Sequence, residues 1–117
     1  MQLILTGLGV SQGIVKGKVK VINGKDDHPH FEEDDILVTH LTDPTMVPMM
    51  SKSSGIICNI GGLTSHPSIV SREMGIPCIV SADKATTILK DGDIIQFDGK
   101  TGEIHKIDDK NWNMRWK

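Results

Sequence analysis

The feature that most constrains this 117-residue chain is a short apolar run that leads through two glycines into a helix. Residues 55–58 (Gly-Ile-Ile-Cys) are continuously apolar and bounded by turn residues, which is typical of a strand buried on both faces. Gly61 and Gly62 allow a sharp turn and a close backbone approach to a ligand. Residues 66–74 have apolar side chains at helical spacing, and Gly75 marks their end. We therefore expect a strand, a glycine turn and a helix in direct succession.

The rest of the chain mixes strands with two further helices. Residues 13–22 alternate apolar and lysine positions, as in a strand whose lysines face solvent. Asp43 is expected to cap a helix that begins at Pro44 and runs to about residue 53. The polar segment 25–35 is expected to be a surface loop. The remaining expected elements are short strands at 3–5, 36–38 and 78–80, a weak helix at 83–90, and a hairpin of 93–97 with 103–107.

Length and composition favour one globular domain over residues 1–117, with residues 108–117 as a peripheral tail. Hydrophobic residues make up 38% of the chain, and its 12 glycines bring the apolar share to about half, as in ordinary globular proteins. No apolar stretch approaches the roughly 18 residues of a membrane span, and the N-terminus does not resemble a secretory signal. Two cysteines are too few for a disulfide scaffold, so we expect a cytoplasmic protein.

Charge and composition also restrict the partners. Thirteen basic and 15 acidic side chains give a net charge of −2, and aromatic residues make up only 3% of the chain. A nucleic-acid partner is therefore not expected. A metal site is not expected either, because Cys58 and Cys78 lack ligand spacing and are expected in buried strands. His28 and His30 flank a proline in an acidic loop, where a solvated role is favoured over metal binding.

The start of the predicted helix has the properties of an anion site. The first N–H groups of a helix lack intrahelical partners, and the positive end of its dipole favours phosphate. The same field disfavours a charged imidazolium, so His66 would be neutral and carry a free lone pair. A neutral histidine beside bound phosphate is a potential phosphoryl acceptor. From the residues alone, the alternative is an ordinary polar histidine at a helix start.

Several neighbouring residues have open or modest roles. Ser65 can cap the helix or donate to a phosphate, and capping is the favoured role. Arg72 lies nearly two turns into the helix, so a solvated or intramolecular ion pair is favoured over a direct phosphate contact. The expected apolar face of the helix comprises Ile69, Val70 and Met74. The core is expected to include Met46, Met49 and Met50, whereas Trp112 and Trp116 can either pack back on the domain or bind a partner.

The run Gly-Gly-Leu-Thr-Ser-His-Pro-Ser-Ile-Val-Ser-Arg-Glu-Met-Gly-Ile-Pro, residues 61–77, resembles the signature of a known family. That family is the swivelling phosphohistidine domain of PEP-utilising enzymes, found in PEP synthase, pyruvate phosphate dikinase and enzyme I of the bacterial sugar phosphotransferase system. Weaker matches at residues 7–19, 42–44 with Met49, and 91–102 extend the resemblance over nearly the whole chain. The resemblance implies an α/β fold, a three-layer swivelling β/β/α domain.

The resemblance also implies a function. His66 would carry a phosphoryl group between an ATP-grasp nucleotide domain and a TIM-barrel PEP/pyruvate domain, with ATP or PEP as the donor in those partner domains. The domain itself would bind no cofactor or metal. Thr64 matches a threonine that is a regulatory phosphorylation site in some dikinases, and Pro67 replaces the usual alanine. The residues expected to bind or support the phosphate are Gly61, Gly62, Thr64, Ser65 and Arg72.

Two function classes remain at this point. In the first, the chain is a phosphotransferase component and not a complete enzyme alone, because 117 residues hold neither partner domain. In the second, the same fold is a non-catalytic spacer or regulatory binding module whose His66 is never phosphorylated. The intact Thr64-Ser65-His66 cluster favours the carrier, since a spacer would not need it. A self-contained hydrolase is disfavoured because the motif has no carboxylate or second base near His66.

Overall fold

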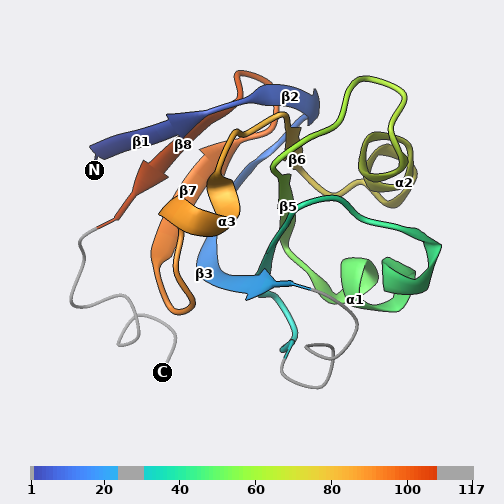
Figure 1. Cartoon of the computed structure of the whole chain (residues 1–117), viewed down its shortest axis with the longest axis horizontal. Coiled ribbons are helices and arrows are strands. Elements are labelled where there is room, and N and C mark those ends of the chain that lie inside the picture. Colours follow the sequence, from blue (N-terminus) through green and yellow to red (C-terminus); the bar gives the residue numbers. More distant parts are fainter. Residues whose placement is uncertain (1, 24–30, 108–117) are drawn as a thin grey trace.

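The computed structural model describes residues 2–23 and 31–107, which form strands and short helices in a mixed order (Figure 1). Strands β1 to β4 precede the helices, and the hairpin of β7 and β8 follows them. The elements in chain order are β1 (Gln2–Thr6), β2 (Leu8–Ser11), β3 (Ile14–Ile22), β4 (Ile36–Thr39), the 3-10 turn η2 (Pro44–Met46), α1 (Val47–Lys52), β5 (Gly55–Cys58), α2 (His66–Met74), β6 (Cys78–Val80), α3 (Ala85–Ile88), β7 (Ile94–Asp98) and β8 (Glu103–Lys106).

The strands form one sheet in the order β1-β8-β7-β3-β4-β5-β6-β2. Strands β3 to β6 pair in parallel, and the outer pairs are antiparallel. The two end strands, β1 and β2, are separated only by Gly7, so this stretch of chain links both ends of the sheet. A Cβ atom at Gly7 would lie 2.7 Å from Ile79 Cγ2 and 2.7 Å from the Val80 carbonyl oxygen. Only glycine fits this crossing without displacing its neighbours.

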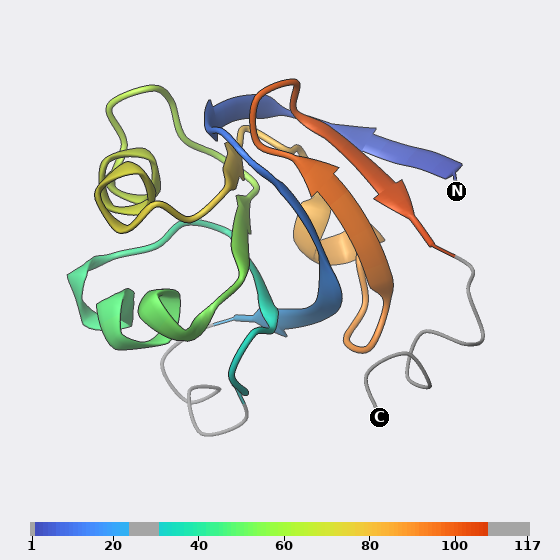
Figure 2. The same ribbon diagram turned by 180° about the vertical axis from the view of Figure 1, so that it is seen from behind.

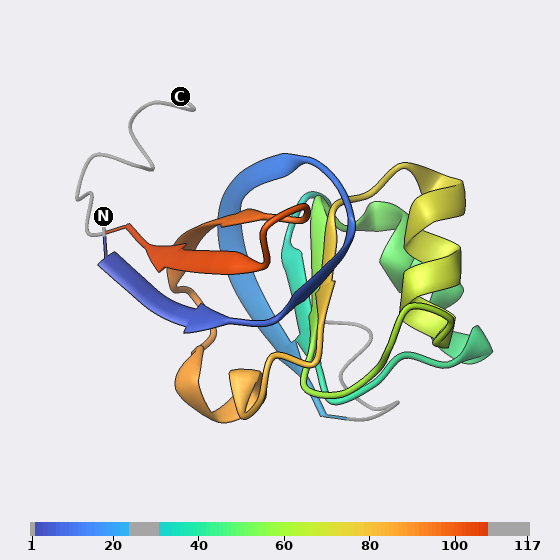
Figure 3. The same cartoon turned by 90° about the horizontal axis from the view of Figure 1, so that it is seen from above.

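The elements are arranged in three layers, β/β/α. Strands β1, β7 and β8 form one layer, strands β3 to β6 the second, and helices α1 and α2 the third (Figures 2 and 3). One core lies between the two β layers and includes Val38, Ile57 and Ile79. A second core lies between the middle layer and the helices and includes Leu37 and Ile56. The central strands are continuously apolar because each of their two faces contributes to a core.

The predicted bounds of β5, α2 and β6 are confirmed residue for residue. The predicted helix from Pro44 is split into a 3-10 turn and α1, with the Asp43 carboxylate accepting the Thr45 N–H at 2.8 Å. The weak helix at 83–90 is reduced to the single turn α3. Strand β2 was not predicted. It is only four residues long and contains a glycine, and it depends on antiparallel pairing with β6, which is distant in sequence.

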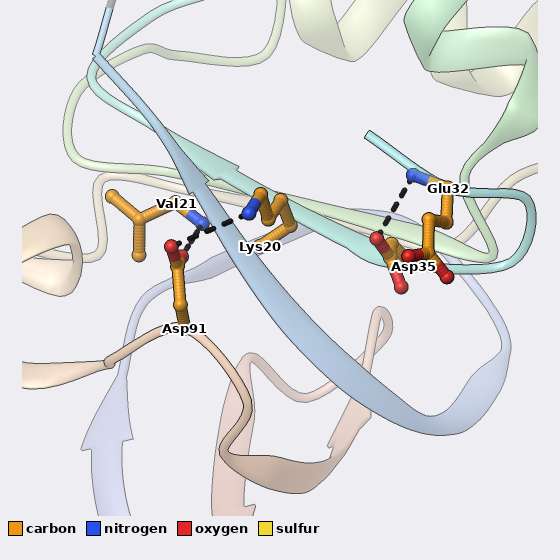
Figure 4. A network of polar contacts seen from close by, with 5 residues as sticks. All are labelled: Lys20, Val21, Glu32, Asp35 and Asp91. Carbon is orange, nitrogen blue, oxygen red and sulfur yellow. Dashed lines mark hydrogen bonds and ion pairs between the residues drawn. The ribbon is translucent and has the colours of Figure 1, made fainter. Parts of the chain in front are cut away.

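The expected surface loop at 25–35 is wrong at its C-terminal end. Residues 24–30 lie outside the described part of the chain, but Phe31 and Asp35 are buried. The Asp35 carboxylate accepts the Glu32 N–H at 3.0 Å, and the Asp35 carbonyl accepts the Ser54 N–H at 3.1 Å. The turn is therefore held against the end of α1. Figure 4 shows this turn beside a second carboxylate contact, in which Asp91 accepts the Val21 N–H and lies 3.5 Å from Lys20 Nζ.

We predict that Asp35→Asn gains stability relative to the wild type as pH rises. Burial raises the pKa of Asp35 above its ordinary value of 3.8, although the Glu32 N–H and nearby lysines oppose this. A carboxyl group whose pKa is raised in the folded state loses stability as pH rises through the interval between the unfolded and folded values. Asparagine avoids this cost and keeps an oxygen acceptor for the Glu32 N–H.

The measurement is urea unfolding of both proteins at about pH 4 and about pH 7. The free energy of unfolding of Asp35→Asn, relative to that of the wild type, should be higher at about pH 7 than at about pH 4. A difference that is the same at both values, or that shifts toward the wild type, would contradict the account of Asp35.

Candidate functional site

The candidate site lies at the carboxyl ends of two neighbouring parallel strands, β4 and β5. Ligand sites in sheets of this kind lie at that edge. Two backbone hydrogen bonds continue the pairing beyond the strands: Asn59 N–H donates to the Thr39 carbonyl at 3.1 Å, and Ile60 N–H to the His40 carbonyl at 3.3 Å. The loop after β4 and the loop after β5 are thereby held side by side.

His66 and Thr42 meet across these two loops. His66 is half-buried and is the first residue of α2, as predicted. Its Nδ1 lies 2.7 Å from Oγ1 of Thr42, whose residue is only 3% exposed. Among the described residues, His66 Nε2 has no hydrogen-bond partner. The contact with Thr42 therefore orients the ring and leaves Nε2 as the nitrogen that can react.

The two glycines before the helix have different roles. Gly61 has a φ of +130°, a conformation that side chains rarely adopt. A Cβ atom there would lie 2.9 Å from Ser65 Oγ and 3.1 Å from Val80 Cβ. A Cβ atom at Gly62 would meet no other atom within 4 Å, so nothing steric requires glycine there. The sharp turn expected of the pair is therefore made at Gly61.

Ser65 occupies the N-cap position of α2, but its hydroxyl does not cap the helix. The prediction that its side chain is a cap is therefore wrong. Ser65 Oγ instead lies 2.9 Å from the Gly62 carbonyl oxygen, which also accepts the Ser65 N–H at 3.2 Å. The turn formed by residues 62–65 thus gives the hydroxyl a carbonyl partner in place of the helix amides.

The Arg72 side chain holds the loop before His66 in place through two hydrogen bonds. Its Nε donates to the Val10 carbonyl at 2.8 Å, and its Nη2 donates to the Leu63 carbonyl. The ion pair favoured by the sequence is wrong, because within residues 2–23 and 31–107 the guanidinium makes no salt bridge. Arg72 thus links β2 to the loop that precedes His66. Thr64 is exposed on that loop, and it makes no hydrogen bond to His66 in the described part of the chain.

The buried face of α2 also differs from the expectation. Ile69 is 45% exposed, and the buried residues of the helix are Pro67, Ser68 and Ser71. Val70 and Met74 pack partly against the helix-side core, as expected. Small residues on the inner face let the helix lie close to the sheet. A 3.6-residue apolar period alone does not reveal a face made of serines.

The other candidate residues give a simpler result. The expected core positions of Met46, Met49 and Met50 are confirmed. Cys58 and Cys78 are buried and free; burial raises the pKa of Cys78 to about 12 and that of Cys58 as well, so neither thiol is a nucleophile near neutral pH. No three His, Cys, Asp or Glu side chains of the described residues form a metal-sized group. Four further candidates lie outside the described residues: His28, His30, Trp112 and Trp116.

Two site residues were missed by sequence reasoning, Thr42 and Ser68. Thr42 was assigned only to a helix start and to a weak family match. The signal that would have found it is its place just after a strand that is parallel to the strand before Gly61. Ser68 was hidden because a serine inside an amphipathic helix is normally a solvent-facing residue.

Comparison with known protein families identifies the class of protein. Residues 31–102 match the family model described as PEP-utilising enzyme, mobile domain. The chain is 46% identical over 105 residues to a probable phosphoenolpyruvate synthase of Archaeoglobus fulgidus, and 39% identical over 103 residues to a rifampicin phosphotransferase of Bacillus cereus. These matches cover 90% and 88% of this chain, but only 14% and 12% of the relatives. The chain belongs to the mobile-domain family of PEP-utilising enzymes.

Solved structures support the same fold. A solution structure of Enzyme I is similar with a TM-score of 0.58 and 26% identity, over 73% of this chain and 35% of that one. The aconitase X of Thermococcus kodakaraensis is similar with a TM-score of 0.68, over 89% of this chain and 98% of that one. Its 17% identity makes it evidence for the fold alone. Separately, none of the helices in the described residues has the length and apolar character of a membrane span.

The difference between the two glycines yields a prediction on stability. Gly62→Ala should keep the wild-type stability or gain up to about 1 kcal/mol, because alanine restricts the unfolded chain. Gly61→Ala should lose about 1–3 kcal/mol, because alanine is strained at a φ of +130° and crowds Val80. Urea unfolding of both variants provides the comparison. Equal losses at the two positions would show that Gly61 is not the residue that makes the turn.

Proposed function

We propose that this chain is a phosphoryl carrier in which Nε2 of His66 accepts a phosphoryl group at one partner site and delivers it to a second. The observation that carries this proposal is the contact between His66 Nδ1 and Thr42 Oγ1 at 2.7 Å. When Nδ1 holds the ring proton and donates it to the Thr42 oxygen, the lone pair of the neutral ring is on Nε2. In this tautomer the Thr42 hydroxyl is the hydrogen-bond acceptor at Nδ1, and Nε2 has the lone pair that a phosphoryl acceptor needs.

The transfer step follows from this geometry. Nε2 attacks the phosphorus atom, the Nε2–P bond forms, and the bond from phosphorus to the leaving group breaks with its electron pair on the leaving group. The ring becomes cationic. The Thr42 oxygen then accepts a hydrogen bond from the Nδ1–H group, which carries part of that positive charge. The phosphoryl group then lies at the N-terminal end of α2, where the helix dipole stabilises an anion by about 0.3–1 kcal/mol.

The partners and the donor are part of the proposal. The relatives named above are several times longer than this chain, and a phosphoenolpyruvate synthase and a rifampicin phosphotransferase are both named for phosphoryl-group chemistry. We infer that a nucleotide-binding, ATP-grasp-like domain and a PEP- or pyruvate-binding domain flank the carrier in its working protein or act as separate subunits. ATP or PEP is then the donor, bound by the partner and not by this domain.

A cytoplasmic location accompanies this proposal. ATP and PEP are cytoplasmic metabolites, and the two cysteines of the chain are free thiols in the structure. Free buried thiols agree with a reducing compartment.

Phosphoramidate, a small phosphoryl donor that needs no partner, tests whether His66 is the acceptor. We expect it to modify His66 faster than His40, an exposed histidine whose Nδ1 lies 3.1 Å from the Asn59 amide nitrogen. The product should be acid-labile and comparatively base-stable, unlike an ester on Thr64 or Ser65. Peptide mass spectrometry after timed incubation gives the rate at each site, and His66→Asn should remove the fast-forming label while the domain stays folded.

The matched control is His40→Asn, which should keep the label on His66. Two results would contradict the carrier proposal: a rate at His66 no greater than at His40, or an acid-labile label that forms as fast in His66→Asn as in the wild type. Either result would favour the spacer or binding-module role instead.

Thr42 should control the rate at His66 through its hydroxyl. Thr42→Val keeps the shape of the side chain and removes the contact with Nδ1, so we expect at least a roughly tenfold slower modification by phosphoramidate. Thr42→Ser keeps the hydroxyl and should stay within about threefold of the wild type. A valine variant as fast as the serine variant would show that the hydroxyl does not orient the ring.

A further inference from the structure

Ser68 is a buried polar residue directed at the loop before His66. Its residue is 0% exposed, and its hydroxyl donates to the Gly62 carbonyl oxygen at 2.6 Å. That oxygen also accepts the Ser65 N–H at 3.2 Å and lies 2.9 Å from Ser65 Oγ. Three donors from the start of α2 therefore converge on one carbonyl.

The hydroxyl protons cannot satisfy all the contacts. Ser65 Oγ and Ser68 Oγ also lie 3.1 Å from each other, so there are three short contacts for two hydroxyl protons. Ser68 is the fully buried partner and makes the shortest contact, so its proton stays on the Gly62 carbonyl. Ser65 is half-buried, and its hydroxyl can then redirect its hydrogen bond because the Gly62 carbonyl still accepts one from Ser68.

We propose that Ser68 is a positioning residue for His66: it holds the Gly62 carbonyl on the helix side and so frees the Ser65 hydroxyl to donate to the phosphoryl group. The inference rests on the proposed carrier function and deepens it by giving the two serines different roles. Ser68 keeps its hydrogen bond to the Gly62 carbonyl, and Ser65 can exchange its own for one to the phosphoryl group. Ser65 would touch the transferred group, whereas Ser68 would act only through the loop.

The need for the Ser68 hydrogen bond follows from Gly62. Gly62 has no Cβ and open space around its α-carbon, so on its side it opposes rotation of the peptide to Leu63 only weakly. A rotated peptide would turn its carbonyl oxygen away from the donors of Ser65 and Ser68. Ser68 opposes this from within the core, and Arg72 holds the next carbonyl, that of Leu63.

A double-mutant cycle with phosphoramidate tests the division of roles. The reaction is displacement of ammonia from phosphorus by His66 Nε2, with one N–P bond formed and one broken. Ser65→Ala should slow the modification of His66 about tenfold in the wild-type background. In the Ser68→Ala background, the Ser65 hydroxyl is needed by the Gly62 carbonyl, so removing it should cost no more than about twofold further.

Ser71 provides the matched control. It is also fully buried on α2, but its hydroxyl lies 3.2 Å from the Ser68 carbonyl and makes no hydrogen bond to the loop in the described structure. Ser71→Ala should leave the rate within about twofold, while Ser68→Ala should lower it about tenfold. Urea unfolding of each variant shows that the compared proteins are folded.

Three outcomes overturn the inference while leaving the carrier function intact: a wild-type rate in Ser65→Ala, equal rates in Ser68→Ala and Ser71→Ala, or losses that simply multiply in the double variant. The first of these does not depend on any change at the buried position 68. Failure of the wild-type protein to react at His66 is a different result, and it would count against the proposed carrier function itself.

Discussion

The parallel pairing of β4 with β5 is the constraint on which the site depends. Thr39 pairs with Cys58, so the two strands end level with each other, and the bond from Asn59 N–H to the Thr39 carbonyl carries the pairing into the loops. Thr42 and His66 are 24 residues apart in sequence and meet only because of this register. A shift of one residue would turn the side chains of β5 to the opposite faces and break both cores.

The site gives a phosphoryl group a nucleophile but little neutralising charge. The guanidinium of Arg72 is engaged with two backbone carbonyls, and the described residues hold no metal-sized group of ligands. Phosphoryl transfer is accelerated chiefly by positioning and by cations placed around the transferred group. In the carrier proposed above, the chain would supply an oriented imidazole and a helix end, and the catalytic cations would come from the partner sites.

Local patterns predicted the central unit well, and long-range contacts account for what they missed. The bounds of β5, α2 and β6 could be predicted because apolar runs, and the helix-ending residues Gly75 and Pro77, are local signals. The place of His66 at the start of α2 was predicted in the same way. The roles of Thr42 and Ser68 depend on which loops meet in space, and strand β2 depends on pairing with β6. The cap expected of Ser65 was wrong because a nearby carbonyl competes for its hydroxyl.

The proposed function depends most on one contact: Thr42 binds Nδ1 of His66, so that Nε2 is the nitrogen that reacts. Nuclear magnetic resonance of the 15N-labelled chain after reaction with phosphoramidate tests it directly, since the imidazole nitrogen bonded to phosphorus can be assigned from its coupling to 31P. The account predicts phosphorus on Nε2 of His66, with a proton retained on Nδ1 beside the Thr42 oxygen. Phosphorus on Nδ1, or a product confined to other residues, would contradict it.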